Sequence, residues 1–181
     1  VASTQSPTVK PGLFTPPPGT VARPDNTVCE GAYDISSVVG YSLFGEITSA
    51  ASAASVDTCE VIRENGIGVW YRVEGDGSTT LVASTCEGTS FDSQISIYSG
   101  SCGKLQCIAG NDQMDLCGLN GDQSRVAFYT ESKTKYYIYV HGRRSASGLF
   151  NLTVEPLLDT NDECDGAVQL NIDVPVFGST R

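Results

Sequence analysis

The segment KYYIYVH, residues 135–141, decides how this 181-residue chain folds. Successive side chains of an extended strand point to opposite sides, which places Tyr136, Ile138 and Val140 on one face and the residues between them on the other. Aromatic and β-branched residues favour strands. The segment therefore predicts a β-strand that packs one of its faces on a core.

Seven further runs of this kind flank the segment, and Gly, Asn, Asp or Ser separate them. They are YSLFGEI (41–47), GVWYRVE (68–74), TTLVAST (79–85), SQISIYS (93–99), LQCIAG (105–110), SRVAFYT (124–130) and GLFNLTVE (148–155). In the last run, the same alternation turns Asn151 away from the core. Eight short strands predict an all-β fold, a jelly-roll-like or Greek-key antiparallel β-sandwich.

Composition indicates one folded core and narrows the range of partners that the chain could bind. Hydrophobic residues make up 40% of the chain, which is enough for one sizeable core. The net charge of -10 argues against nucleic acid, because phosphates attract basic surfaces. No run of about 18 apolar residues is present, so we expect no insertion into a membrane.

The chain repeats part of its own sequence. DNTVCEGAYDI at residues 25–35 is echoed by NDECDGAVQL at residues 161–170, and LFGEIT from Leu43 by VFGSTR from Val176. Self-similarity at a fixed spacing indicates a repeat array, and here the spacing is the size of a domain. We expect one complete domain flanked by parts of its neighbours.

Three parts follow from this pattern. Residues 1–24 hold most of the eight prolines together with many Thr and Ser, and they predict an extended linker. Residues 25–157 predict the disulfide-bonded sandwich. Residues 158–181 predict a second linker and the first strands of a following repeat.

The seven cysteines fit this division, because Cys164 is the counterpart of Cys29 in the following repeat and the other six lie in the sandwich. Cys102 and Cys107 are the one closely spaced pair of cysteines. No second pair and no histidine lies beside them, which disfavours a metal site. We therefore expect three disulfides and an extracellular or cell-surface location.

The sequence alone leaves fifteen pairings of the six cysteines open. A short hairpin and the order along the chain favour Cys102 with Cys107, Cys29 with Cys59, and Cys86 with Cys117.

Acidic and amide side chains gather at strand ends, where their oxygens suit Ca²⁺. One group consists of Asp92, Asn111 and Asp112, and the other consists of Asp25 and Asn26 at the entrance of the domain. The alternative is that these side chains bond the backbone of their own turns. Any calcium would be structural, since no base stands beside these residues.

Two further features concern modification and catalysis. Asn151, Leu152 and Thr153 form an N-glycosylation sequon on the outer face of a strand, so we expect a glycan there. The single histidine, His141, ends a Tyr-rich strand, and no set of acid, base and nucleophile accompanies it. We expect that the protein is not an enzyme.

Four stretches carry a family resemblance: GVWYRVEGDG, TLVASTCEGTSFDSQISIYSGSCGKLQCIAGND, SRVAFYTESKTKYYIYVHG and GLFNLTVE. They resemble the bacterial prepeptidase C-terminal (PPC) domain and its cysteine-bearing, tandem-repeat relatives in secreted and surface proteins. The resemblance implies a non-catalytic jelly-roll-like sandwich, appended to secreted peptidases or strung in tandem on surface proteins. In some relatives calcium binds near the domain entrance, which here implies Asp25 and Asn26.

The sequence thus predicts an extracellular structural or adhesive module whose partners are copies of itself, with glycans as a further candidate partner. The alternative is a substrate-targeting domain of a secreted hydrolase or peptidase, but the many cysteines and the lack of an attached peptidase weaken it. Residues 161–181 alone cannot bury a core. We expect them either to continue into the next repeat or to complete a sheet in another subunit. Both arrangements give a head-to-tail contact that propagates into a filament unless it closes into a ring.

Overall fold

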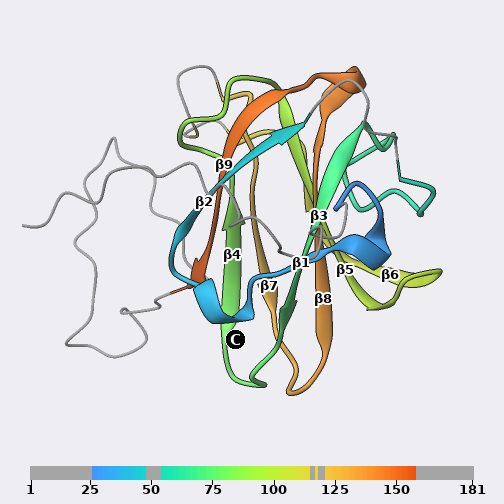
Figure 1. The fold of residues 1–181 in the computed structure, drawn as a ribbon, viewed down its shortest axis with the longest axis vertical. Helices are drawn as coiled ribbons and strands as arrows, with labels where there is room; N and C mark the ends of the chain where they lie inside the picture. Colours follow the sequence, from blue (N-terminus) through green and yellow to red (C-terminus); the bar gives the residue numbers. More distant parts are fainter. Residues whose placement is uncertain (1–25, 48–53, 115–116, 118–120, 158–181) are drawn as a thin grey trace, which may run out of the picture.

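The computed structural model describes residues 26–47, 54–114, 117 and 121–157, and these form an all-β sandwich of two sheets (Figure 1). The predicted linker at residues 1–24 and the predicted repeat start at residues 158–181 lie outside the described residues. Nothing in the described part of the chain is a helix long and apolar enough to cross a membrane.

The larger sheet has five strands in the order β1-β3-β8-β5-β6. Their bounds are β1 Tyr33–Asp34, β3 Gly68–Glu74, β8 Lys135–Gly142, β5 Ser93–Ser101 and β6 Lys104–Asn111. All neighbours are antiparallel except β1, which pairs with β3 in parallel. The short β1 is the one strand of this sheet that the sequence did not predict.

The smaller sheet has four antiparallel strands in the order β2-β9-β4-β7. Their bounds are β2 Ser42–Ile47, β9 Gly148–Pro156, β4 Thr80–Ser84 and β7 Arg125–Tyr129. All eight predicted strands are therefore present. Three short 3-10 helices complete the described elements: η1 Cys29–Gly31, η2 Ser36–Val38 and η3 Arg143–Ser145.

The core lies between the two sheets, and the predicted alternation fills it. Ile138 and Val140 of β8 face Phe150, Leu152 and Val154 of β9 within one cluster of buried side chains. The burial of so much apolar surface is the main driving force for the sandwich.

The opposite face of β8 is also buried, which the alternation did not predict. Trp70, Tyr98, Tyr137 and Tyr139 form a second apolar cluster with Cys59 on the outside of the larger sheet. The Trp70 and Tyr139 rings stack at 4.4 Å. Burial raises the pKa of Tyr139 to about 12, and its hydroxyl donates to the Gly66 carbonyl. The larger sheet is thus covered on both faces.

Three disulfides join the strands, and two of the three predicted pairings are wrong. The bonds are Cys29–Cys102, Cys59–Cys107 and Cys86–Cys117, so only the last pairing is confirmed. The cause is the β5–β6 hairpin: Cys102 lies in its turn, beyond Ser101 paired with Lys104, whereas Cys107 lies opposite Tyr98. Each cysteine therefore meets a different segment.

Candidate assembly surface

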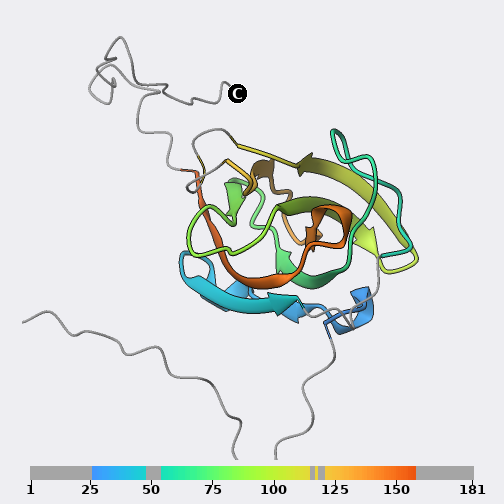
Figure 2. The same cartoon turned by 90° about the horizontal axis from the view of Figure 1, so that it is seen from above.

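Residues 29–47 run along the edges of both sheets, and we call this segment the edge strap. It contains η1, β1, η2 and β2 in chain order. Coloured blue to cyan, it crosses from the larger sheet to the smaller one in Figure 1 and follows one side of the sandwich in Figure 2. One continuous segment therefore ends one edge of each sheet.

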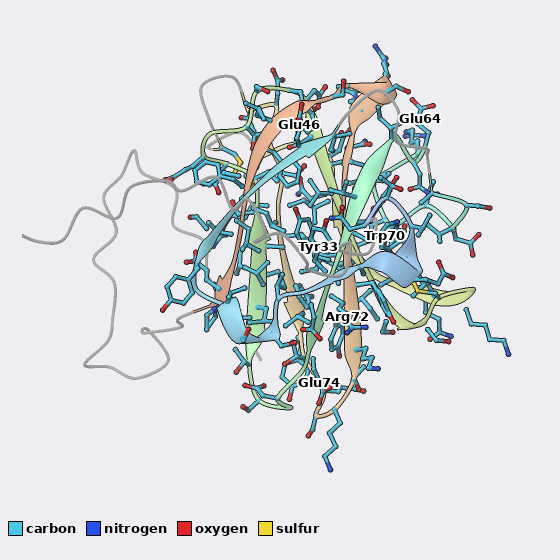
Figure 3. All side chains as sticks on the ribbon, in the orientation of Figure 1. Tyr33, Glu46, Glu64, Trp70, Arg72 and Glu74 are labelled. Atoms are coloured by element: carbon cyan, nitrogen blue, oxygen red, sulfur yellow. A yellow bond between two sulfur atoms is a disulfide. The ribbon has the colours of Figure 1, made fainter. Side chains whose placement is uncertain are left out.

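The first half of the strap binds β3. Tyr33 and Asp34 pair with Tyr71 and Arg72, and the Ile35 amide donates to the Arg72 carbonyl at 2.9 Å. Figure 3 shows Tyr33 beside β3, the strand that carries Trp70, Arg72 and Glu74. The disulfide Cys29–Cys102 anchors the start of the strap to the tip of the β5–β6 hairpin.

An ion pair supports this contact. Arg72 Nη2 lies 3.1 Å from Asp34 Oδ2. Burial alone would raise the pKa of Asp34, but hydrogen bonds from Ser36 and the charge of Arg72 lower it overall. The pair is largely exposed to water, so its contribution to stability is small.

The second half of the strap binds β9. β2 pairs with β9 from Ser42 opposite Thr153 to Ile47 opposite Gly148. The ring of Phe150 lies directly on the backbone of Gly45, where a Cβ atom would stand 2.2 Å from its Cζ. Any larger residue at this position would force the Phe150 ring to move.

Three exposed apolar side chains lie in β2 or next to it. Phe44 is 78% exposed, Tyr41 is 68% exposed, and Leu149 of the neighbouring β9 is 63% exposed. β2 also ends the order of its sheet, so its outer backbone edge faces no further strand among the described residues. Apolar side chains beside an open strand edge are typical of sites where another chain binds. The alternation in LFGEIT turns Phe44 away from the core, so part of this apolar surface could have been predicted from the sequence.

The first group of predicted calcium ligands surrounds an arginine. Arg143 Nη1 lies 3.6 Å from Asp92 Oδ2, and Arg143 Nε lies 3.6 Å from Asp112 Oδ2. Gln94 Nε2 donates to Asp112 Oδ1 at 2.8 Å. Burial raises the pKa of Asp92, against the charge of Arg143, and the charges of Asp112 and Asp122 raise it further. The two predicted carboxylates are thus brought together across a guanidinium group.

Several oxygens near this cluster are buried without a hydrogen-bond partner. They are Asp92 Oδ1, Gln94 Oε1, Asn111 Oδ1 and Gln123 Oε1. Buried acceptors normally have a donor, a water molecule or an ion. However, no three His, Cys, Asp or Glu side chains in the described residues are grouped as metal ligands.

The second predicted calcium group is only partly described, because Asp25 lies outside the described residues. Asn26 bonds to β3: its Nδ2 donates to the Trp70 carbonyl at 3.3 Å, and its carbonyl accepts from the Trp70 amide at 2.7 Å. This residue therefore fixes the chain where it enters the sandwich.

Asn151 lies on the outer face of β9, opposite Phe44, as the alternation predicted. The residue is nevertheless only 9% exposed, because the loop that contains Gly88 and Thr89 covers it. The Asn151 amide donates to Thr89 Oγ1 at 3.3 Å. The expected exposure to solvent is wrong, and the glycan remains a prediction.

His141 is fully buried in β8. Its Nδ1 accepts from the Gly66 amide at 3.2 Å, so the ring proton sits on Nε2, which faces Ser96 Oγ at 3.1 Å. Burial lowers the pKa of His141 to about 3. In this tautomer the imidazole donates to the serine and does not take its proton, which is the reverse of what a nucleophilic serine needs.

Comparison with known proteins gave no assignment, since no family model and no curated protein matches the chain.

Proposed function

We propose that this chain is a non-catalytic extracellular structural or adhesive module, the repeating unit of a tandem or head-to-tail array. The observation that carries the proposal is the match between the repeated sequence and the edge strap. The residues echoed at 161–170 and 176–181 include β1 and most of β2, which end one edge of each sheet. A chain that repeats an edge-forming segment carries the means to join one sandwich to another.

The surface of the strap supports self-association. An open strand edge beside Tyr41, Phe44 and Leu149 offers both backbone hydrogen bonds and apolar contacts to a second copy. A repeated head-to-tail contact of this kind propagates into a fibre unless it closes into a ring. Three disulfides suit the oxidising compartment that the proposal requires.

A non-catalytic role is supported by the geometry of the one histidine. His141 is buried and neutral, and its hydrogen bonds leave it no free acceptor nitrogen for a nucleophile. The two-sheet fold is also the one that the likeness to PPC domains implies, and membership of that family is part of the same proposal.

The alternative is a substrate-targeting domain of a secreted hydrolase or peptidase, as the resemblance to PPC domains implies. The exposed aromatic side chains of the strap suit a binding role of this kind as well. The full gene separates the two functions: many copies of the module favour the array, and one copy beside a protease domain favours targeting.

A structural calcium ion forms a further part of the proposal. The carboxylates of Asp92 and Asp112 and the unpartnered oxygens of Gln94 and Asn111 are hard oxygen ligands of the kind that Ca²⁺ prefers. The ion would tie the loop before β5 to the loop after β6.

Electron microscopy and light scattering of the full chain test the array. We expect elongated assemblies that Phe44→Ser weakens, because this change removes the most exposed apolar side chain of the strap. The control is Val61→Ser, which removes another exposed apolar side chain, outside the edge strap. Monomers at all concentrations, together with monomers in native material, would contradict the proposed function.

A further inference from the structure

The echo preserves three of the strap residues that touch the larger sheet or the core beneath it. Gly31 is buried, Ala32 packs on the outer aromatic cluster, and Ile35 is buried in the core between the sheets. Their counterparts, 135 positions later, are Gly166, Ala167 and Leu170. Small residues remain small and the buried apolar residue remains apolar.

The same holds for the contact with the smaller sheet. Leu43 packs against the core, and Gly45 leaves room for the Phe150 ring. Their counterparts, 133 positions later, are Val176 and Gly178. The glycine is the stronger match of the two, because a Cβ at position 45 would lie 2.2 Å from Phe150 Cζ and would force the buried ring to move.

The seventh cysteine completes the match. Six of the seven cysteines in the sequence are bonded to one another, so none of these six is left to pair with Cys164. Its counterpart Cys29 is bonded to Cys102. Because Cys164 occupies the position of Cys29 in the repeat, it is expected to form a disulfide with Cys102 of another sandwich.

We propose that residues 164–181 of one copy act as a second edge strap on a second copy of this chain, where they replace residues 29–47 and Cys164 bonds Cys102. The proposal rests on the proposed array and names the join between its units. In the recipient, β3 would gain the segment around Leu170, and β9 would gain the segment around Gly178.

Thiol–disulfide exchange makes this bond without an added oxidant. The Cys164 thiolate attacks Cys102 Sγ, the Cys29–Cys102 bond breaks, and the Cys164–Cys102 bond forms. Cys29 leaves as a thiolate and takes up the proton that Cys164 lost. One disulfide is consumed and one is formed, so the electrons balance.

The solvent exposure of the cysteines indicates which of the three disulfides exchanges. Cys29 and Cys102 are both partly exposed. The other two bonds each contain a cysteine that is almost completely buried, Cys59 at 0% exposure and Cys117 at 1%. Cys29–Cys102 is therefore the one disulfide in which neither cysteine is buried, so that solvent reaches both residues, and exchange requires such access.

Two differences weaken the second strap relative to the first. The counterpart of Asp34 is Gln169, which cannot form the ion pair with Arg72, and the counterpart of the buried Ile47 is Thr180. The chain's own strap therefore holds its place in a monomer, and a neighbour's strap displaces it only at high protein concentration or when exchange makes the new bond covalent.

The test uses the full chain, with equal amounts of isotopically labelled and unlabelled protein, in a glutathione redox buffer. We expect covalent multimers on non-reducing gels and a Cys102–Cys164 peptide that joins labelled to unlabelled chains. Cys164→Ser should remove these multimers. Gly178→Val should reduce them several-fold without changing the melting temperature of the monomer, because position 178 contacts Phe150 only in the recipient.

Ser179→Val is the matched control, because its counterpart Glu46 lies on the outer face of β2 and its change should leave the multimers intact. The strap join is wrong if Cys164 is found bonded to another Cys164, to glutathione alone, or to Cys102 of its own chain. If Cys164→Ser still yields arrays, the proposed function stands and only this join fails. If every form, native material included, is monomeric, both fail.

Discussion

Single residues set the path of the strap, and Gly45 shows this best. Any side chain there meets the Phe150 ring, since even a Cβ would lie 2.2 Å from its Cζ. We expect Gly45→Ala to lower the free energy of unfolding by about 1–3 kcal/mol, as overpacking does in cores. Urea denaturation measures the loss. Ser42→Ala, at an exposed position of the same strand, is the control and should change stability little.

The pH dependence of stability tests the buried imidazole. The pKa of His141 falls from an ordinary 6.5 to about 3 on folding. Below pH 6.5 the unfolded chain binds a proton that the folded chain refuses, so stability falls as the pH decreases towards 3. This group alone contributes up to about 1.4 kcal/mol per pH unit in that window.

His141→Asn is the comparison for this effect. The variant should lose this part of the slope between pH 6.5 and 4, as measured by urea denaturation at each pH. Equal slopes in the two proteins would show that the imidazole is protonated in the folded state.

At the scale of elements, the disulfide Cys29–Cys102 fastens the strap. It closes a loop with a sequence separation of 73, against 31 for Cys86–Cys117. Replacing both cysteines of either bond with Ala should cost about 2–4 kcal/mol, with the larger loss for the longer loop, because that bond restricts the unfolded chain more. Thermal unfolding of the two double variants checks the order. A larger loss for Cys86–Cys117 would mean that strain or residual structure outweighs loop length.

Calcium should act on the loops around Asp92 and Asp112. If the ion binds there, millimolar Ca²⁺ raises the melting temperature and a chelator reverses the effect, because a ligand of the folded state stabilises it. Asp112→Asn should remove the response. Asp76→Asn is the control, since Asp76 accepts its hydrogen bonds from Ser78, Thr79 and Thr130 at a separate turn. An unchanged melting temperature would identify these carboxylates as partners of Arg143 alone.

Most of the sandwich was predictable, because strand alternation is a local signal. The faces of Ile138, Val140, Phe150 and Leu152 were correctly placed. The disulfide partners of Cys29 and Cys59 were not, because they depend on how distant strands lie side by side. Cys102 lies in the hairpin turn just before Lys104. Cys107 stands three residues beyond Lys104, which is about 10 Å farther along an extended strand. That distance exceeds the roughly 4.4–6.8 Å between the Cα atoms of bonded cysteines, so Cys102 had to find a partner elsewhere.

The strap itself escaped prediction for a related reason. Its β1 has only two residues, too few for periodicity to reveal, and its pairing with β3 is parallel and distant in sequence. The burial of Asn151 depends on a loop that returns from more than 60 residues away. The repeat was visible in the sequence, but its physical meaning required the position of residues 29–47 in the fold.

At the scale of the whole molecule, charge opposes assembly. Each chain carries a net charge of -10, so copies repel one another at low ionic strength. We expect assembly to be faster and more complete as salt rises from about 10 mM to 150 mM, where the Debye length falls from about 30 Å to 8 Å. Light scattering at several salt concentrations measures this. Faster assembly at low salt would indicate that opposite charges make the join.

The anchoring of the strap has a mechanical consequence. When tension reaches the module through residues before Cys29, the covalent bond to Cys102 carries it into the β5–β6 hairpin, and the hydrogen bonds of β1 and β2 bear little load. The bond also locks a sequence separation of 73, which stretches to about 250 Å when fully extended. An oxidised module that keeps its own strap therefore withholds that length when it is pulled from its ends, and the length becomes available only after its disulfides are reduced.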